Sequence, residues 1–176
     1  MIGETLITIG VISNSKAGKT LIEKISKAIG GICEPYQIKR VAKAEVEASI
    51  IKAYGENYLT DLHRRAMFRR IEEDAKQQKN IEDIIIKALP NLKEDSKPEN
   101  IEDDWITNFF AKSRLISDEK MQILWARVLA GEANVPGAFS KRAVNFLESL
   151  DKKEAEYFKA LCSFAWVNDN ELNPFI

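Results

Sequence analysis

The stretch SDEKMQILWARVLAGE, residues 117–132, contains the signals that begin and bury one helix. Ser117 is a favourable N-cap residue, and Asp118 and Glu119 place negative charge against the positive end of the helix dipole. Apolar residues then recur at the i, i+3, i+4, i+7, i+8 spacing of an amphipathic helix: Met121, Leu124, Trp125, Val128 and Leu129. The pattern predicts a structural helix whose tryptophan lies in the core.

The end of the stretch predicts where this helix stops and which side chains stay outside the core. Gly131 stands where a left-handed C-cap residue belongs, and a Pro-Gly pair soon turns the chain. Gln122, Arg127 and Glu132 do not belong to the apolar stripe. We therefore expect Arg127 and Glu132 to be the residues of this stretch worth testing for function.

Helical patterns continue toward the N-terminus. Residues 19–29 repeat apolar positions at helical spacing and end at the glycine pair 30–31, which predicts a left-handed stop. Residues 35–55 form a second apolar stripe that ends at a glycine. Both segments are typical of amphipathic helices.

The longest helical pattern begins after Thr60 or Asp61 as N-cap and ends at Pro90. One long helix and two helices with a break near Asn80 both fit. The apolar stripe from Leu62 to Leu89 is longer than a small lobe needs to cover, so it favours self-association.

Compact helices are predicted after the polar segment 91–104. The first contains Trp105, the second is the stretch quoted above, and the third begins near Ser140. A fourth begins at Asp151, because Glu154 three residues later completes a capping box. The apolar face of this fourth helix comprises Ala155, Phe158, Leu161, Cys162 and Ala165.

The predicted fold class is all-α, a long helical hairpin followed by a compact helical bundle. An N-terminal helical lobe with long amphipathic helices occupies residues 1–90, a polar linker 91–104, and a C-terminal bundle 105–176. The bundle is expected to pack around Trp105, Trp125 and Phe139. The last residues, NDNELNPFI, provide no closing element, so we expect the bundle to be truncated at its C-terminus.

Composition excludes several classes of protein. The 26 basic and 27 acidic residues give a net charge of -1, so no global field attracts nucleic acid. Cys33 and Cys162 form neither a disulfide framework nor a metal motif, which favours a cytoplasmic location. No apolar run is long enough for a membrane span. Peripheral membrane contact by residues 1–12 is disfavoured but open, because this segment is apolar and spaced by glycines.

Two sequence features resemble catalytic or cofactor sites without meeting their requirements. IGVISNSKAGKT has the order of a phosphate-binding loop, but Ser13 stands where that motif needs glycine. His63 is the only histidine, and it lies beside two arginines rather than beside a nucleophile. We therefore expect no cofactor, no bound metal and no enzymatic activity.

HRRAMFRR, residues 63–70, is the only basic patch. Its four arginines flank a methionine and a phenylalanine, a mixture that can grip phosphates and stack on bases. Asp61 precedes the patch and Glu72, Glu73 and Asp74 follow it at helical spacing, which favours a self-neutralised helix face. The alternatives are binding of nucleic acid or of an acidic partner protein. The candidate binding residues are Arg64, Arg65, Arg69 and Arg70.

Four blocks of this sequence resemble an uncharacterised bacterial family catalogued only as a domain of unknown function. They are IKRVAKAEVEASI, the arginine-rich segment with QQKNIEDII, DDWITNFFAKSRLISDEKMQILWARVLAGE, and PGAFSKRAVNFLESLDKKEAEYFKALCSFAW. The family is similar in outline to helical proteins encoded near bacterial phage-defence genes. The resemblance implies no catalytic residues.

These observations favour a non-enzymatic interaction or regulatory protein, in a bacterial phage-defence or toxin–antitoxin-like system. The alternative is a nucleic-acid-binding regulator that uses the arginine patch or the helix pair 140–161. That pair would be the first two helices of a helix-turn-helix or winged-helix unit whose wing is absent. A protein partner or a second copy of the chain is the expected ligand.

Overall fold

The structure is a computed structural model of the 176-residue chain. It describes residues 15–30 and 61–151, the helical positions 153, 154, 156, 157 and 160, and the backbone of 165–168 and 171–174. The predicted helix at 35–55, the segment 1–12 and both cysteines lie outside the described residues.

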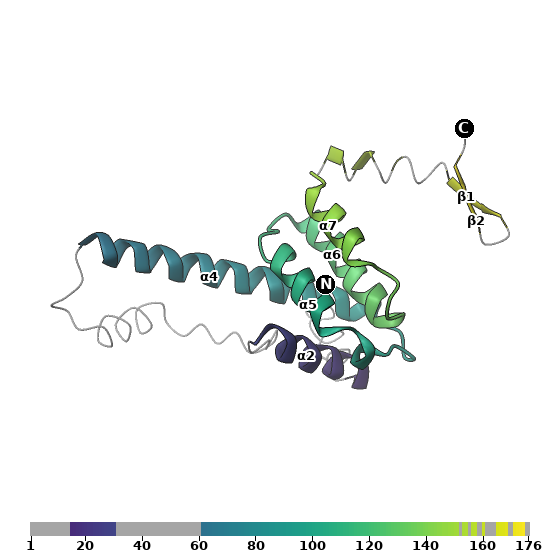
Figure 1. The fold of residues 1–176 in the computed structure, drawn as a ribbon, viewed down its shortest axis with the longest axis horizontal. Helices are drawn as coiled ribbons and strands as arrows, with labels where there is room; N and C mark the ends of the chain where they lie inside the picture. Colours follow the sequence, from purple (N-terminus) through teal and green to yellow (C-terminus); the bar gives the residue numbers. More distant parts are fainter. Residues whose placement is uncertain are drawn as a thin grey trace, which may run out of the picture.

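The fold is all-α, as the periodicity predicts. The helices are α2 (Lys16–Ile29), α4 (Asp61–Ala88), α5 (Asp103–Ser113), α6 (Glu119–Asn134) and α7 (Lys141–Ser149). Two 3₁₀ turns, η1 (Leu89–Asn91) and η2 (Pro98–Asn100), connect α4 to α5. Figure 1 shows α2, α5, α6 and α7 gathered around one end of α4. A single continuous α4 settles the choice between one long helix and two.

A short hairpin follows the helices in the chain. Strand β1 (Ala165–Asn168) pairs antiparallel with β2 (Glu171–Pro174), with Trp166 opposite Asn173. One prediction was wrong here. Ala165 begins a strand instead of continuing the helix from Asp151.

Aromatic side chains from α5 and α6 form the centre of the core. The Phe109 ring stacks on Trp105 with centroids 5.0 Å apart and meets Trp125 edge-on at 5.1 Å. Trp125 is completely buried, which confirms the prediction from the apolar stripe. Phe139 is half-buried and packs against the same cluster.

The polar segment 91–104 contributes to this core. Pro98 and Ile101 are buried, and the Lys97 amide donates to the carbonyl of Ala133 at 3.0 Å. One core cluster contains residues from α2 and α4 before this segment and from α5, α6 and α7 after it. The division into two lobes stays a prediction.

Helix α6 differs at both ends from the pattern read in the sequence. Asp118 is the N-cap, and its Oδ1 accepts from the amide of Met121 at 3.1 Å. The helix continues through Gly131 to Asn134, so the predicted left-handed stop at Gly131 was wrong. Gln122 and Glu132 are also buried, because each bonds a backbone group that the sequence pattern does not reveal.

Other caps agree with the sequence. Gly30 ends α2 with φ +69°, and Asp151 and Glu154 exchange the two hydrogen bonds of a capping box. Residues 18–20 of the phosphate-loop-like segment lie in the first turns of α2. The Lys24 ammonium lies 2.6 Å from Asp103 Oδ1, and its hydrogen bond holds the pKa of that carboxyl below its ordinary value.

Candidate interaction surface on helix α4

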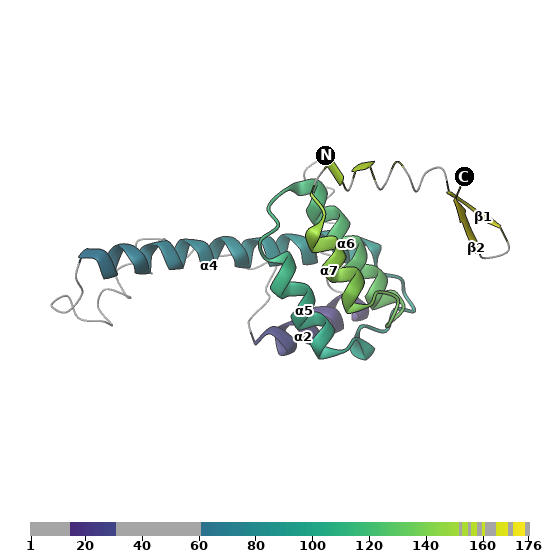
Figure 2. The ribbon, with the colours of Figure 1, turned by 45° about the horizontal axis from the view of Figure 1, so that its top comes forward.

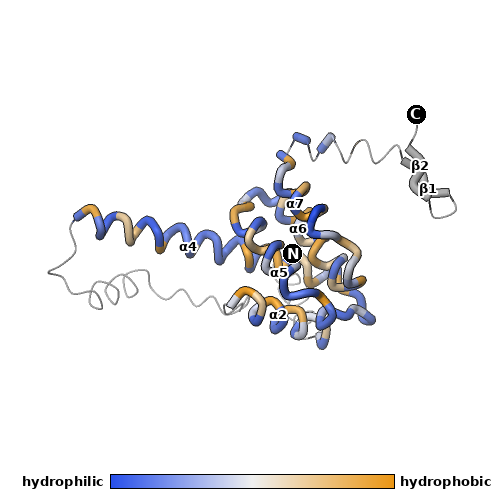
Figure 3. The backbone as a smooth tube through the Cα atoms, in the orientation of Figure 1, coloured by the Kyte–Doolittle hydropathy of each residue, from blue (hydrophilic) through white to orange (hydrophobic). Residues whose placement is uncertain are grey.

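Helix α4 changes character along its length. From Asn80 to Ala88 it packs into the core, with Ile81, Ile84 and Ile85 buried against the bundle. From 61 to 79 no residue is buried. Both Figures 1 and 2 show this part projecting from the bundle, and Figure 3 shows it as mainly hydrophilic. We call residues 61–79 the arm.

The predicted apolar stripe from Leu62 to Leu89 is therefore buried only in its second half. Leu62, at the tip of the arm, is 66% exposed. Met67, Phe68 and Ile71 are half-buried. The periodicity correctly predicts the helix, but it does not reveal where the helix leaves the core.

Ion pairs within the arm account for most of its charge. Arg64 and Arg65 both pair with Asp61, one turn earlier in the helix. Arg69 Nη1 lies 2.9 Å from Glu73 Oε1, and Arg70 Nε lies 3.8 Å from Asp74 Oδ2. All these side chains are more than half exposed. Each pair contributes only a few tenths of a kcal/mol in such exposed positions, but together they support a part of α4 in which no residue is buried.

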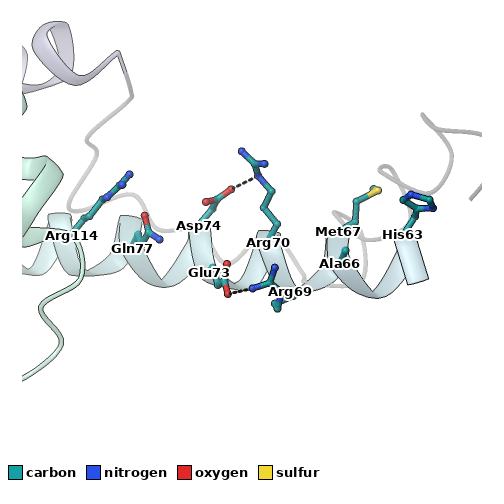
Figure 4. Close-up of a pocket in the computed structure, with 9 residues that line it drawn as sticks. All are labelled: His63, Ala66, Met67, Arg69, Arg70, Glu73, Asp74, Gln77 and Arg114. Carbon is teal, nitrogen blue, oxygen red and sulfur yellow. Dashed lines mark hydrogen bonds and ion pairs between the residues drawn. The ribbon is translucent and has the colours of Figure 1, made fainter. Parts of the chain in front are cut away.

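An open groove of about 620 Å³ runs along one face of the arm. Figure 4 shows Arg70 and Asp74 on this face, with Met67 and His63 toward the tip. Arg114, from the turn between α5 and α6, marks the end of the groove nearest the bundle. Arg69 and Glu73 also line the groove, whereas Arg64 and Arg65 do not. The structure thus divides the four predicted arginines into two groups.

Buried amides hold the base of the arm. Asn80 Nδ2 donates to the carbonyl of Arg114 at 2.8 Å, and Gln122 Nε2 donates to the carbonyl of Ile116 at 2.9 Å. Lys87 Nζ donates to Gln122 Oε1 at 2.8 Å. Sequence reasoning missed this cluster, since a polar residue on a helix reads as exposed. It attaches α4 to the turn between α5 and α6 just where the arm leaves the core.

Glu132 is a structural residue. Its two carboxylate oxygens accept from the amides of Gly137 and Phe139 at 2.7 and 2.8 Å. The Trp105 indole donates to the carbonyl of Phe139 at 2.7 Å. A Cβ at Gly131 would lie 2.6 Å from the Phe139 ring. Residues of the LAGE-PG-FS block, from Leu129 to Ser140, therefore fix the conformation of the loop between α6 and α7.

A second cleft, of about 580 Å³, opens beside this loop. Lys141 and Arg142 line it, but so do Glu102 and Glu132. Lys141 lies 3.6 Å from Asp104. Arg127, the other residue of the quoted stretch left for testing, is exposed on α6 and lines neither cleft.

Among the described residues, no group of three or more histidine, cysteine, aspartate or glutamate side chains could hold a metal ion. Within the same part of the chain, no helix has the length and apolar content needed to cross a bilayer.

The model of a family described as "Protein of unknown function (DUF2806)" matches residues 64–176, more than half of the chain. The chain belongs to this family. Neither a curated protein nor a solved structure matches the chain.

The DUF2806 match confirms the resemblance to an uncharacterised domain family. The matched segment begins at Arg64 and so includes most of the arm, the amide cluster at its base and the Glu132 loop. Helix α2 lies outside the match, although it packs against α5.

Proposed function

We propose that this DUF2806 protein is a non-enzymatic interaction or regulatory protein whose contact surface is the arm of α4. The observation that carries the proposal is the change in burial at Asn80. Six of the nine residues from Asn80 to Ala88 are buried in the core, and none of the nineteen residues before them is buried.

A long helix that is polar on most faces gains little stability from burial of apolar side chains. Such helices are stabilised by pairs of opposite charges one turn apart, and they bridge to other surfaces. The arm has these pairs, and the amide cluster around Asn80 fixes its base to the bundle. It therefore presents a pre-formed helical surface, which lowers the entropy lost on binding.

The groove supports a binding role rather than catalysis. Its arginines and carboxylates are more than half exposed and pair with each other. Acid–base chemistry favours carboxylates in a dry pocket, where burial separates their roles.

We further propose that this role belongs to a bacterial phage-defence or toxin–antitoxin-like system. The support is the outline similarity to helical proteins encoded near phage-defence genes. Deletion of the gene from its native host should change phage plating efficiency or the toxicity of a neighbouring gene product. Unchanged plating and unchanged toxicity would count against this part of the proposal.

The test of the arm is affinity purification from the native host with matched variants. Charge reversal of the four arm arginines (Arg64, Arg65, Arg69 and Arg70 to Glu) should remove the proteins that copurify. The control reverses four exposed basic residues of the bundle (Lys16, Lys19, Lys27 and Arg127 to Glu) and should retain them. Equal recovery from both variants would show that the arm is not the contact surface.

A nucleic-acid-binding role is the second candidate. In its favour, α7, the capped helical segment after Asp151 and the β1–β2 hairpin follow the order of a winged-helix unit. Residues 140–176, however, carry five basic and six acidic side chains, which gives no electrostatic footprint for a phosphate backbone. A salt-titrated mobility-shift assay tests this candidate. It compares nucleic-acid binding by the wild type, by Lys141→Glu/Arg142→Glu and by the four-arginine variant. Salt-sensitive binding that either variant abolishes would favour this candidate.

A further inference from the structure

The groove face of the arm carries charges of opposite sign in two adjacent blocks. Arg69 and Arg70 lie toward the tip, and Glu73 and Asp74 lie one turn closer to the bundle. A second arm that runs antiparallel presents the same blocks in reverse order. We propose that two copies of this chain pair their groove faces antiparallel, with the two-fold axis between Arg70 and Glu73. The inference rests on the proposed function, because it names the partner of the arm.

The position of the axis matches the length of the arm. At 1.5 Å per residue, residues 61–79 span about 28 Å, and residue 70 is their midpoint. With the axis between Arg70 and Glu73, the two arms therefore overlap over nearly their whole length. Arg70 then lies opposite Glu73 of the second copy, and Asp74 lies opposite Arg69 of the second copy. Each such contact occurs twice, as two-fold symmetry requires.

The charge pattern favours a second copy over a polyanion. Glu73 and Asp74 line the groove as openly as Arg69 and Arg70, so a nucleic acid or a uniformly acidic helix would meet repulsion along half of its length. The Arg70–Asp74 separation of 3.8 Å exceeds a hydrogen-bond distance. Arg70 therefore keeps guanidinium donors for a carboxylate of another chain.

Sedimentation of the full chain from ~1 μM to ~1 mM tests the pairing, because this range covers weak self-association. The wild type should show a concentration-dependent dimer that high salt weakens. Arg69→Glu/Arg70→Glu and Glu73→Lys/Asp74→Lys should each raise the dimer Kd roughly tenfold or more. An equimolar mixture of these two variants should form the heterodimer with near wild-type affinity, since opposite blocks again face each other.

Two controls keep the test separate from folding. Lys16→Glu/Lys19→Glu changes two exposed basic residues of α2, outside the arm, and should leave the dimer Kd unchanged. The combined variant with all four groove charges exchanged restores the pairs within each helix and should dimerise by itself. Circular dichroism shows whether each variant keeps its helix.

The outcomes are distinguishable. A wild-type monomer at every concentration, or a dimer that both groove variants retain, overturns the pairing. If the chain stays monomeric while the four-arginine variant still loses its host partners, self-pairing is wrong and the arm remains a contact surface for another molecule. If partners and dimer both survive arm reversal, the proposed function fails as well.

Discussion

The side-chain amide of Asn80 donates to the backbone carbonyl of Arg114 at 2.8 Å, at the point where α4 leaves the core. Asn80 is the first buried residue after nineteen that are not, and Arg114 lies in the turn that closes the groove. This hydrogen bond joins the arm to the bundle, and it fixes where one ends and the other begins.

Replacement of Asn80 by leucine should destabilise the fold. The substitution leaves the Arg114 carbonyl without its donor, and an unpaired, partly buried acceptor costs about 1–3 kcal/mol. Urea denaturation measures the loss. Asn91→Ala is the matched control, because its amide caps the Lys87 carbonyl in an exposed position and should cost about 0.5 kcal/mol or less. Equal costs for the two variants would contradict the role given to Asn80.

Substitution by phenylalanine should destabilise the protein by different amounts at the two core tryptophans. The Trp105 indole donates to Phe139, whereas the buried Trp125 indole has no hydrogen-bond partner among the described residues. Trp105→Phe therefore loses packing and also leaves a carbonyl unpaired, an extra cost of about 1–3 kcal/mol. Thermal unfolding should rank Trp105→Phe as the less stable variant, and the opposite ranking would refute the assignment.

Trp125→Ala should cost roughly 3–5 kcal/mol as a core truncation.

Gly131→Ala should destabilise the protein although alanine is the better helix former by roughly 1 kcal/mol. The new methyl group would lie 2.6 Å from Phe139 Cε2, so overpacking of about 1–3 kcal/mol outweighs the gain in propensity. In a Phe139→Leu background the same substitution should become neutral or stabilising. A double-mutant cycle measures this coupling, and simple additivity would show that the ring is not the obstacle.

The Lys24–Asp103 pair should contribute to stability only above the acid range. Its hydrogen bond lowers the pKa of Asp103 in the folded state below the unfolded value of about 3.9. The contribution is therefore complete above that value and disappears as the pH falls through the lower, folded pKa. Denaturant midpoints measured between about pH 2 and 7 should lose part of their acid dependence in Asp103→Asn. An identical pH profile would count against the pair.

Local patterns predicted the helices because each carries its own signals. The i, i+3, i+4 spacing around Trp125, the glycine after α2 and the Asp151–Glu154 capping box all act within a few residues. The positions of Gln122 and Glu132 were not predictable in this way. Each forms a hydrogen bond with a backbone group in the turn or loop beside its helix, and helical periodicity contains no information about such partners.

The sequence predicted which charged residues form the candidate surface, but it did not predict that this surface projects from the bundle. The spacing of Asp61, Glu73 and Asp74 correctly indicated pairs with the four arginines. What the sequence did not show is that α4 leaves the core at Asn80, since the apolar stripe continues through that position without a break. The point at which α4 leaves the core depends on where the turn between α5 and α6 packs against it, and that is a tertiary property.

The central claim is that the arm of α4 is the contact surface, and photo-crosslinking in the native host tests it most directly. A photoreactive amino acid replaces Arg70, which is 83% exposed in the groove, or Arg127, which is exposed on α6 and serves as the control. The account predicts a crosslinked product from position 70, to a second copy or to another molecule, and none from position 127. Crosslinks from position 127 alone, or from neither position, would contradict it.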